Sequence, residues 1–312
     1  MSDEAGYHEP VLEKETVDGL NVREDGRYLD GTLGGGGHFR MIAQRLCSRG
    51  FLIGLDRDAD AIAHVRSNPP DSPATIYLER APFSEFDSLL RKHGIDRVDG
   101  MLLDLGVSSH QLDDLTRGFS YQRDGKLDMR MDQSRNVTAA HLLQTLDCRE
   151  LGELLEKYGE LRNAQRMARA IGAWRTHNSL TTVAELKRCL HKEYGERLSY
   201  KMLAKLFQAL RISVNNELQE LQLFLQNAVD FLNVGGRLVI LAYHSLEDRM
   251  VKTFMKQQEQ DCICPSPAVR CTCDNRRRLT RINRKAIVAS QSEIRSNRRA
   301  RSARLRIAEK NA

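Results

Sequence analysis

Two carboxylates and a run of glycines lie close together in the chain, at a spacing that suits the binding of a nucleoside. Asp30 ends a short apolar segment, Gly34–Gly37 follow it, and Asp56 comes twenty residues after Gly36, behind a second apolar run. Glycines allow a tight turn that a ligand can approach closely. An acid after the second strand can accept hydrogen bonds from ribose hydroxyls. The stretch therefore predicts a strand, a glycine loop, a helix and a second strand, with a nucleoside-bearing cofactor across the strand ends.

Motifs that are absent narrow the choice of cofactor. The dinucleotide fingerprint G-x-G-x-x-G is not met, because Phe39 stands where the third glycine would fall when counting from Gly34. The pattern G-x-x-x-x-G-K-[ST] does not occur either, which disfavours a P-loop nucleotidase. Loose glycines with acids after two strands suit S-adenosylmethionine, since this ligand has no pyrophosphate for a helix N-terminus to bind. A flexible surface turn is the alternative interpretation.

Two further residues could take part in chemistry at the same edge of the predicted sheet. Asp104 ends an apolar strand, and open α/β sheets bind ligands outside the carboxyl ends of their strands. His244 follows another predicted strand, and histidine exchanges protons near neutral pH. Gln111 lies on a loop that would cover the site. The structural alternatives are a helix cap at Asp104 and, for Ser245, a cap that Asp248 completes as a capping box.

A cluster of cysteines near the end of the chain could hold a metal. Cys262, Cys264, Cys271 and Cys273 form the pattern C-x-C-x6-C-x-C, and four thiolates can bind zinc. However, the C-x-C spacing is tighter than the usual C-x2–4-C, and two prolines interrupt the loop. We therefore favour a cysteine-containing surface loop and expect no metal in the functional site.

The elements that must position these residues alternate between strand and helix up to about residue 105, which indicates parallel βαβ units. Residues 106–132 are polar and irregular, as long functional or disordered loops are. Helical periodicity then runs to about residue 205, and a strand at 237–243 resumes the sheet. We predict an α/β fold with an inserted all-helical domain. Its parts are a first α/β part, the insertion and a second α/β part: 1–110, 111–205 and 206–312.

Two predictions concern the second α/β part. Residues 206–233 have the pattern of one long helical stretch, which Gly235 and Gly236 end. Ala303–Ile307 alternate between apolar and basic side chains, which is typical of an edge strand.

The charge of the chain is unevenly distributed. The 312 residues carry a net charge of +6, from 48 basic and 42 acidic side chains. Residues 276–312 hold thirteen of the basic and two of the acidic side chains, so the remainder is acidic, with 35 against 40. A basic segment on an otherwise acidic chain indicates an anionic partner such as nucleic acid.

Composition also bears on the compartment. No apolar run approaches the roughly 18 residues that suggest a membrane span, and the first residues lack the basic and apolar parts of a secretory signal. The seven cysteines are an odd number and mostly scattered, which argues against a disulfide framework. We expect a cytoplasmic protein with no membrane partner, and no feature points to a protein partner.

Ten sequence strings, taken together, resemble a single protein family. They are HEPV (8–11), DGTLGGGGH (30–38), LDRD (55–58), LLDLGVSS (102–109), RGFS (117–120), LDMRMD (127–132), FQALRI (207–212), VNNEL (214–218), HSLEDR (244–249) and RARSARLRIAE (299–309). Because they occur in order over nearly the whole chain, and several are long and uncommon, they are far more specific than a glycine loop. The chain resembles the bacterial 16S ribosomal RNA cytosine-N4 methyltransferases, the RsmH or MraW type.

The resemblance implies a Rossmann-like class I methyltransferase domain, S-adenosylmethionine as the cofactor, and a helical insertion that recognises RNA. It implies methyl transfer to N4 of a cytidine in the decoding region of 16S ribosomal RNA, in the small ribosomal subunit. By analogy, Asp56 would hold the ribose, Phe83 would lie near the adenine, and Asp104 and Gln111 would close the site. The family's cofactor contacts fall on these residues: Gly36, Gly37, His38, Asp56, Phe83, Asp104 and Gln111.

The sequence departs from the family at a few positions, among them Tyr243, where many members have Phe; we expect none of them to touch the cofactor contacts. For the chemistry, Asp104 or a backbone carbonyl after it would accept a hydrogen bond from the cytosine amine. His244 or water would take the leaving proton. A methyltransferase of DNA or protein remains an alternative, as does a non-catalytic RNA-binding assembly factor.

Overall fold

The computed structural model describes residues 10–264, 272–273 and 275–312, and the chain divides into two compact units. Residues 107–218 form one, which we call the helical unit. The other described residues, before 107 and after 218, form the second, which we call the sheet unit. The domain boundary predicted at residue 205 falls inside helix α10 (Tyr200–Asn215), which lies entirely in the helical unit.

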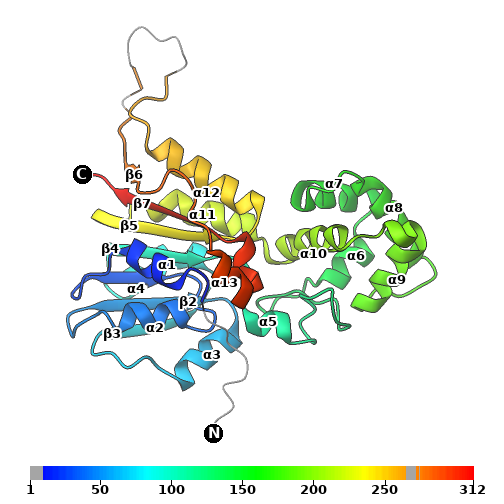
Figure 1. Cartoon of the computed structure of the whole chain (residues 1–312), viewed down its shortest axis with the longest axis horizontal. Coiled ribbons are helices and arrows are strands. Elements are labelled where there is room, and N and C mark those ends of the chain that lie inside the picture. Colours follow the sequence, from blue (N-terminus) through cyan, green and yellow to red (C-terminus); the bar gives the residue numbers. More distant parts are fainter. Residues whose placement is uncertain (1–9, 265–271, 274) are drawn as a thin grey trace. The chain divides into compact units, whose positions relative to one another are not determined.

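The sheet unit is built on a sheet with the strand order β3-β2-β1-β4-β5-β7-β6 (Figure 1). β1 to β5 run parallel, and β7 runs antiparallel to both of its neighbours. The strands are β1 (Arg27–Asp30), β2 (Phe51–Asp56), β3 (Thr75–Arg80), β4 (Val98–Asp104), β5 (Leu232–Ala242), β6 (Leu279–Arg281) and β7 (Arg304–Lys310). We call the edge at which β1, β2, β4 and β5 end the carboxyl edge, and the opposite one the amino edge.

The prediction of an edge strand at 303–307 is half wrong. The segment is a strand, β7, but it lies between β5 and β6 and is not at the edge. The edge strand on that side is β6, which has three residues and follows a run of arginines. Its shortness hides the alternation that identifies strands in a sequence.

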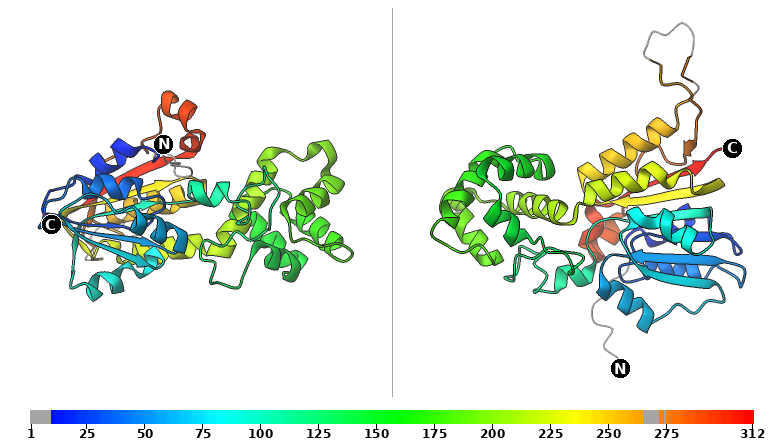
Figure 2. Two further views of the ribbon diagram at one scale, coloured as in Figure 1. Left: turned by 90° about the horizontal axis from the view of Figure 1, so that it is seen from below. Right: turned by 180° about the vertical axis from the view of Figure 1, so that it is seen from behind.

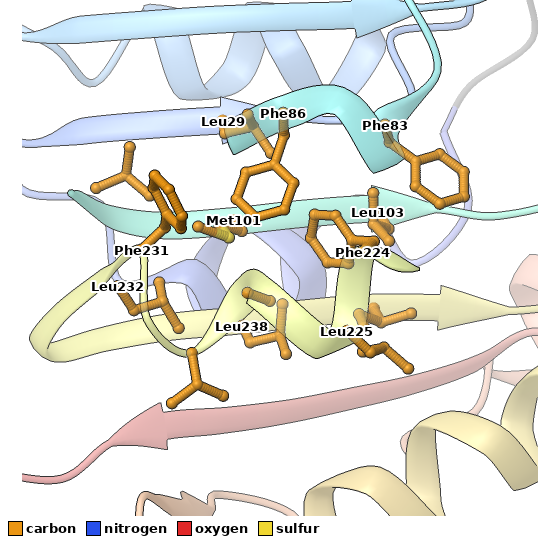
Figure 3. Close-up of a cluster of buried hydrophobic side chains, with 14 of the residues drawn as sticks. Leu29, Phe83, Phe86, Met101, Leu103, Phe224, Leu225, Phe231, Leu232 and Leu238 are labelled. Atoms are coloured by element: carbon orange, nitrogen blue, oxygen red, sulfur yellow. The ribbon is translucent and has the colours of Figure 1, made fainter. Parts of the chain in front are cut away.

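Helices cover both faces of the sheet, and a hydrophobic core lies under each set (Figure 2). Along β4, Met101 and Leu103 enter one core and Leu102 enters the other, as the pleat of a strand requires. Figure 3 shows the first core, where Phe86 packs against Phe224 and Phe231 with ring centroids 4.9 Å and 5.3 Å apart. Burial on both faces explains why the parallel strands are continuous apolar runs in the sequence.

The helices divide between the faces according to the core that they contribute to. The first core takes side chains from η1 (Phe83–Glu85), α4 (Phe86–Lys92), α11 (Glu217–Ala228) and α12 (Ser245–Gln258). The second takes them from α1 (Glu13–Leu20), α2 (Gly37–Ala43), α3 (Ala59–Ser67), α13 (Gln291–Ser296) and η3 (Arg298–Ser302). Within the described residues, no helix is both long enough and apolar enough to cross a membrane.

The order of the strands creates a switch point at β1. The chain moves outward through β2 and β3 on one side of β1, and then returns to place β4 on the other side. Connections that leave in opposite directions open a crevice outside the strand ends, where α/β proteins bind their ligands.

The helical unit has its own hydrophobic core, formed by its helices and by part of the irregular segment after α5. Its elements are α5 (Ser109–Asp113), α6 (Ala139–Thr145), α7 (Cys148–Gly159), α8 (Ala164–Arg175), α9 (Val183–Tyr194), η2 (Gly195–Arg197) and α10. The predicted single helical stretch at 206–233 is wrong. α10 ends at Asn215, its C-cap Asn216 has a left-handed φ of 52°, and α11 starts anew behind it.

The irregular segment between α5 and α6 is ordered by buried polar groups. The Asn215 side chain, which is 1% exposed, accepts from the Met131 N–H (2.8 Å) and donates to the Met129 carbonyl (2.7 Å). Arg117 is buried too and donates to the carbonyls of Arg130 and Met131, both at 3.0 Å. Side chains therefore provide the hydrogen bonds that a helix or sheet would otherwise supply.

Replacing Asn215 with Ala should lower the free energy of unfolding of the helical unit by at least ~2 kcal/mol. Two buried backbone groups would lose their partner, and each such loss costs about 1–3 kcal/mol. Urea titration followed by tryptophan fluorescence measures this unit selectively, because Trp174 is the single tryptophan of the chain. The exposed Gln144→Ala change in α6 is the matched control and should leave the midpoint unchanged. Equal midpoints for both variants would contradict the assigned role of Asn215.

Candidate active site

Three aspartates lie together at the carboxyl edge, around the switch point. Asp30 ends β1, Asp56 ends β2 and Asp104 ends β4. Asp30 is level with Gly54 and Leu102 on the neighbouring strands, so Asp56 and Asp104 each lie two residues further along. Side chains two residues apart on a strand point to the same face. The register of the sheet therefore brings all three carboxylates to one side.

Burial makes these carboxylates hard to ionise. It raises the pKa of Asp30 to about 7. A hydrogen bond from the Thr32 N–H lowers this pKa, and the negative charges of Asp104 and Asp56 raise it further. It raises the pKa of Asp56 to about 6, and it raises the pKa of Asp104 as well. Neither Asp30 nor Asp56 forms an ion pair with any residue that the structure describes. A positively charged ligand would stabilise the ionised cluster.

The glycine loop is tied to Asp56. The carboxylate accepts one hydrogen bond from the Gly34 N–H and one from the Asp58 N–H, both at 2.8 Å. Gly34 and Gly36 have positive φ angles of 50° and 78°, which side chains disfavour. A Cβ atom at Gly36 would also lie 2.7 Å from the Val65 side chain. The glycines in the sequence therefore correctly predicted a turn that needs backbone conformations open to glycine.

His38, in the first turn of α2, faces the acidic cluster. Its Nδ1 atom lies 3.6 Å from Oδ2 of Asp104, and its side chain is 6% exposed. Its Nε2 atom is buried and has no hydrogen-bond partner among the described residues. Buried polar atoms are nearly always paired, so this nitrogen is a candidate contact for a bound ligand. The fold thus brings together two of the predicted cofactor contacts, His38 and Asp104.

Tyr243 completes the surroundings of Asp104. Its hydroxyl donates to Oδ1 of Asp104 at 2.8 Å, and the ring packs against the backbone of Gly106. Burial, and then the negative charge of Asp104, raise the pKa of Tyr243 well above its usual value, so the phenol remains a donor. The expectation that no departure from the family touches the predicted cofactor contacts is wrong at this position. The Asp104 backbone N–H is held as well, by Thr32 Oγ1 at 2.6 Å.

Phe83 borders the cluster from the other face of the sheet. It opens η1 and is 9% exposed, with its ring edge-on to Phe224 at 5.8 Å (Figure 3). The Arg57 guanidinium lies 5.9 Å from the ring centre. A Cβ atom at Gly31 would come within 3.0 Å of the Phe83 side chain, so Phe83 lies beside the end of β1. Its predicted place near the adenine stays a prediction.

His244 has a structural task that the sequence assigned to its neighbour. His244, not Ser245, is the N-cap of α12, and Glu247, not Asp248, completes the capping box. The Nδ1 atom accepts from the Glu247 N–H at 3.4 Å, and Nε2 lies 3.1 Å from Glu247 Oε1. Asp248 instead binds Arg306. A role for His244 as proton acceptor stays a prediction.

Gln111 belongs to the helical unit, unlike the other predicted cofactor contacts. Its side chain accepts from the Ser108 N–H at 3.1 Å and completes the capping box of α5. Its predicted cofactor contact stays a prediction.

Two groups at the cluster escaped the list of site residues predicted from the sequence. Asp30 was recognised as an acid at a strand end, but its burial to 1% exposure arises only in the folded chain. The contact of Tyr243 with Asp104 depends on the pairing of β4 with β5, which places Asp104 level with Leu241. The only sequence feature that could have indicated Tyr243 as a site residue is its position at the end of an apolar run.

The five parallel strands, their switch point and the acidic carboxyl edge define a Rossmann-like methyltransferase domain, as the resemblance implied. The family model described as the MraW methylase family matches residues 5–311. The chain belongs to this family.

Relatives along the full length agree. A ribosomal RNA small subunit methyltransferase H from Clostridium botulinum is 41% identical over 305 residues, which is 97% of this chain and 98% of the relative. A protein of the same name from Bacteroides thetaiotaomicron is 44% identical over 309 residues, which is 99% of each.

Solved structures are more distant in sequence. An rRNA methylase from Streptococcus thermophilus is 10% identical with a TM-score of 0.41, and the match covers 96% of this chain and 95% of that one. A SAM-dependent O-methyltransferase from Thermotoga maritima is 12% identical with a TM-score of 0.40, over 98% of this chain and 68% of that one.

The electrostatics of the cluster predict a pH dependence for S-adenosylmethionine, which carries a positive sulfonium. Protonation removes the negative charges of Asp30 and Asp56, whose pKa values are about 7 and about 6. Affinity should therefore rise by about tenfold or more from pH 5 to pH 8, since one ion pair in a partly buried site contributes a few kcal/mol. Calorimetric titration measures it. S-adenosylhomocysteine, which lacks the sulfonium charge, is the matched control and should show a weaker dependence; identical profiles for the two ligands would be inconsistent with this electrostatic account.

Proposed function

We propose that this protein transfers the methyl group of S-adenosylmethionine to N4 of a cytidine in the decoding region of the small-subunit ribosomal RNA. Family membership and the shared name of the full-length relatives support the reaction class and the RNA. The observation that carries the cofactor is the buried acidic cluster of Asp30, Asp56 and Asp104 at the switch point. A ribosomal substrate would place the enzyme in the cytoplasm.

The residues around the cluster fit this cofactor. S-adenosylmethionine supplies an electrophilic methyl group on a positively charged sulfur. The positive φ angles of Gly34 and Gly36 shape a loop without side chains, and Asp56 keeps lone pairs for ribose hydroxyls beside its two backbone bonds. The buried Nε2 atom of His38 offers one further polar contact. Carboxylates without a cationic partner attract the positive sulfonium of S-adenosylmethionine. They bind S-adenosylhomocysteine, whose sulfur is uncharged, less tightly.

Asp104 is the residue best placed to act on the acceptor base. The lone pair of the cytosine amine is delocalised into the ring, so the amine needs a hydrogen-bond acceptor that draws its electrons toward nitrogen. The Asp104 side chain is 26% exposed, and Tyr243 occupies its Oδ1 atom. The Oδ2 atom, 3.6 Å from His38, can therefore accept from an amine. Partial burial, which raises the pKa of Asp104, makes this oxygen a better acceptor.

Positioning supplies the remainder of the rate. A methyl sulfonium needs in-line attack, and fixed geometry lowers the entropic cost of bringing donor and acceptor together. The cytosine must leave its stack to reach the carboxyl edge, which unpaired RNA permits at low cost. We assign recognition of the surrounding RNA to the helical unit and to part of the basic segment.

Only part of the basic segment is available for RNA. Arg306 is 7% exposed and makes a bidentate ion pair with Asp248, at 2.7 Å and 3.1 Å. Arg281 binds Glu259 at 2.7 Å, and Arg278 binds Asp230. These arginines connect β6 and β7 to α12 and to the segment before β5. The number of basic residues in this segment is therefore larger than the number available to bind RNA.

Two exposed arginines of the basic segment lie near the active site. Arg295 in α13 and Arg298 in η3 are exposed and form no ion pair with the described residues. Both elements precede β7, whose first residue Arg304 pairs with Ala242 at the end of β5. They therefore lie at the carboxyl edge, next to Tyr243, where they can bind phosphates of the incoming RNA.

The product test of the function uses a strain that lacks the gene. Its small-subunit RNA should lose N4-methylcytidine, which mass spectrometry of digested nucleosides measures. The wild-type gene should restore the modification, whereas Asp104→Asn should restore less than about a hundredth of the rate, since a lost interaction of about 3 kcal/mol is a factor of more than a hundred. Tyr243→Phe should be intermediate, because it keeps the carboxylate.

Other outcomes of this experiment identify the alternatives. Unchanged N4-methylcytidine together with another lost methyl mark would indicate a different substrate. A ribosome assembly defect that Asp104→Asn corrects as well as wild type does would indicate a non-catalytic assembly factor.

Changing Arg295 and Arg298 together to Gln should weaken binding of a decoding-region RNA fragment and reduce its salt dependence. Each lost phosphate contact lowers the slope of log affinity against log salt by about 0.7. The matched control is Arg49→Gln with Arg97→Gln, since both residues are exposed at the amino edge. Filter binding at several salt concentrations measures both pairs. If the control pair weakens RNA binding as much, the carboxyl edge has no special role.

A further inference from the structure

Three thiols lie close together in the connection between α12 and β6. The sulfurs of Cys262, Cys264 and Cys273 all lie within 4.8 Å of one another. Cys271, the fourth cysteine of the sequence pattern, lies outside the described residues, and we assign it no role. The sequence spacing favoured a surface loop, but spacing says nothing about how the two halves of the loop meet.

The distance between two of the sulfurs matches a metal site. Cys262 Sγ and Cys273 Sγ are 3.7 Å apart. Two thiolates bound to zinc at about 2.3 Å with tetrahedral geometry lie about 3.8 Å apart. A disulfide would need a separation of about 2.05 Å. The spacing excludes a covalent bond and is the spacing of two ligands on a shared metal ion; two thiols in an S–H···S hydrogen bond also lie at this distance.

Backbone N–H groups point at the sulfurs, as they do around a thiolate. The Cys264 N–H donates to Cys262 Sγ at 3.4 Å, and the Ile263 N–H donates to Cys273 Sγ at 3.3 Å. The Thr272 N–H donates to Cys264 Sγ at 3.4 Å. Donors of this kind favour the ionised form, which is the form that binds metals.

The base of the loop is already fixed. The Arg278 N–H donates to the Gln258 carbonyl at 2.8 Å, and the Asn275 side chain donates to the Gln260 carbonyl at 2.6 Å. Glu259 joins the two limbs through Arg281. The cysteines on opposite limbs are thus held side by side by contacts that do not involve a metal, so the ligand set is preorganised.

We propose that Cys262, Cys264 and Cys273 form a structural zinc site that closes the loop between α12 and β6. Thiolate ligands select zinc over magnesium and calcium. β6 begins opposite Lys310 at the amino edge, whereas the acidic cluster lies at the carboxyl edge. The metal therefore takes no part in methyl transfer, and its role is to hold the loop and the adjacent arginines in place.

Metal content tests the proposal independently of activity. Full-length protein, reduced and dialysed against zinc chloride and then against metal-free buffer, should retain about one zinc per chain by mass spectrometry. Cys262→Ser, Cys264→Ser and Cys273→Ser should each lose most of it, while Cys47→Ser, a control outside the cluster, should retain it. Circular dichroism and binding of S-adenosylmethionine verify that each variant is folded.

Cobalt substitution and thiol counting distinguish the remaining possibilities. Cobalt(II) in the site should give the intense absorption of thiolate-to-metal charge transfer, and the Cys262→Ser variant should weaken it. Zinc binding that the serine variants leave unchanged would overturn the proposal. So would wild-type protein that binds no zinc, including the case in which two of its seven thiols are lost to a disulfide and return with reductant.

Discussion

The electric field that Asp30, Asp56 and Asp104 exert on one another is set by the register of three parallel strands. β1 is flanked by β2 and β4, and pairing of Asp30 with Gly54 and Leu102 leaves the other two acids on the same face. Burying carboxylates costs free energy unless a positive charge compensates. A bound cation would therefore lower the electrostatic free energy of this site. The glycine loop, His38 and Tyr243 are all arranged around this cluster.

α12 links the two edges of the sheet. It begins at the carboxyl edge, where the His244 capping box fixes the chain directly behind Tyr243. It ends at Gln258, where the limbs of the cysteine loop are joined. Its first turn is fixed to β7 by the buried pair of Asp248 and Arg306. The fold therefore separates chemistry at one edge from reinforcement at the other, with one helix spanning both.

The arginines near the C-terminus show how tertiary structure divides one sequence feature into two functions. In β6 and β7 and directly before β6, arginines meet Glu259, Asp248 and Asp230 and stabilise the edge of the sheet. Arg295 in α13 and Arg298 in η3 remain exposed beside the active site. Charge alone could not separate the groups, because ion pairing depends on acids that lie 20 to 60 residues away in the chain.

The sequence by itself determined most of the elements and the edge where the chemistry lies. Apolar runs ending in Asp30, Asp56 and Asp104, together with Gly34–Gly37, are local patterns, and local patterns report strands, turns and strand ends. The long motifs identified the family. Only the tertiary structure decided what depends on distant partners: the hydrogen bond of Tyr243 to Asp104, the cap at His244, the position of β7 inside the sheet and the approach of Cys273 to Cys262. Each needs two segments whose pairing no short stretch of sequence encodes.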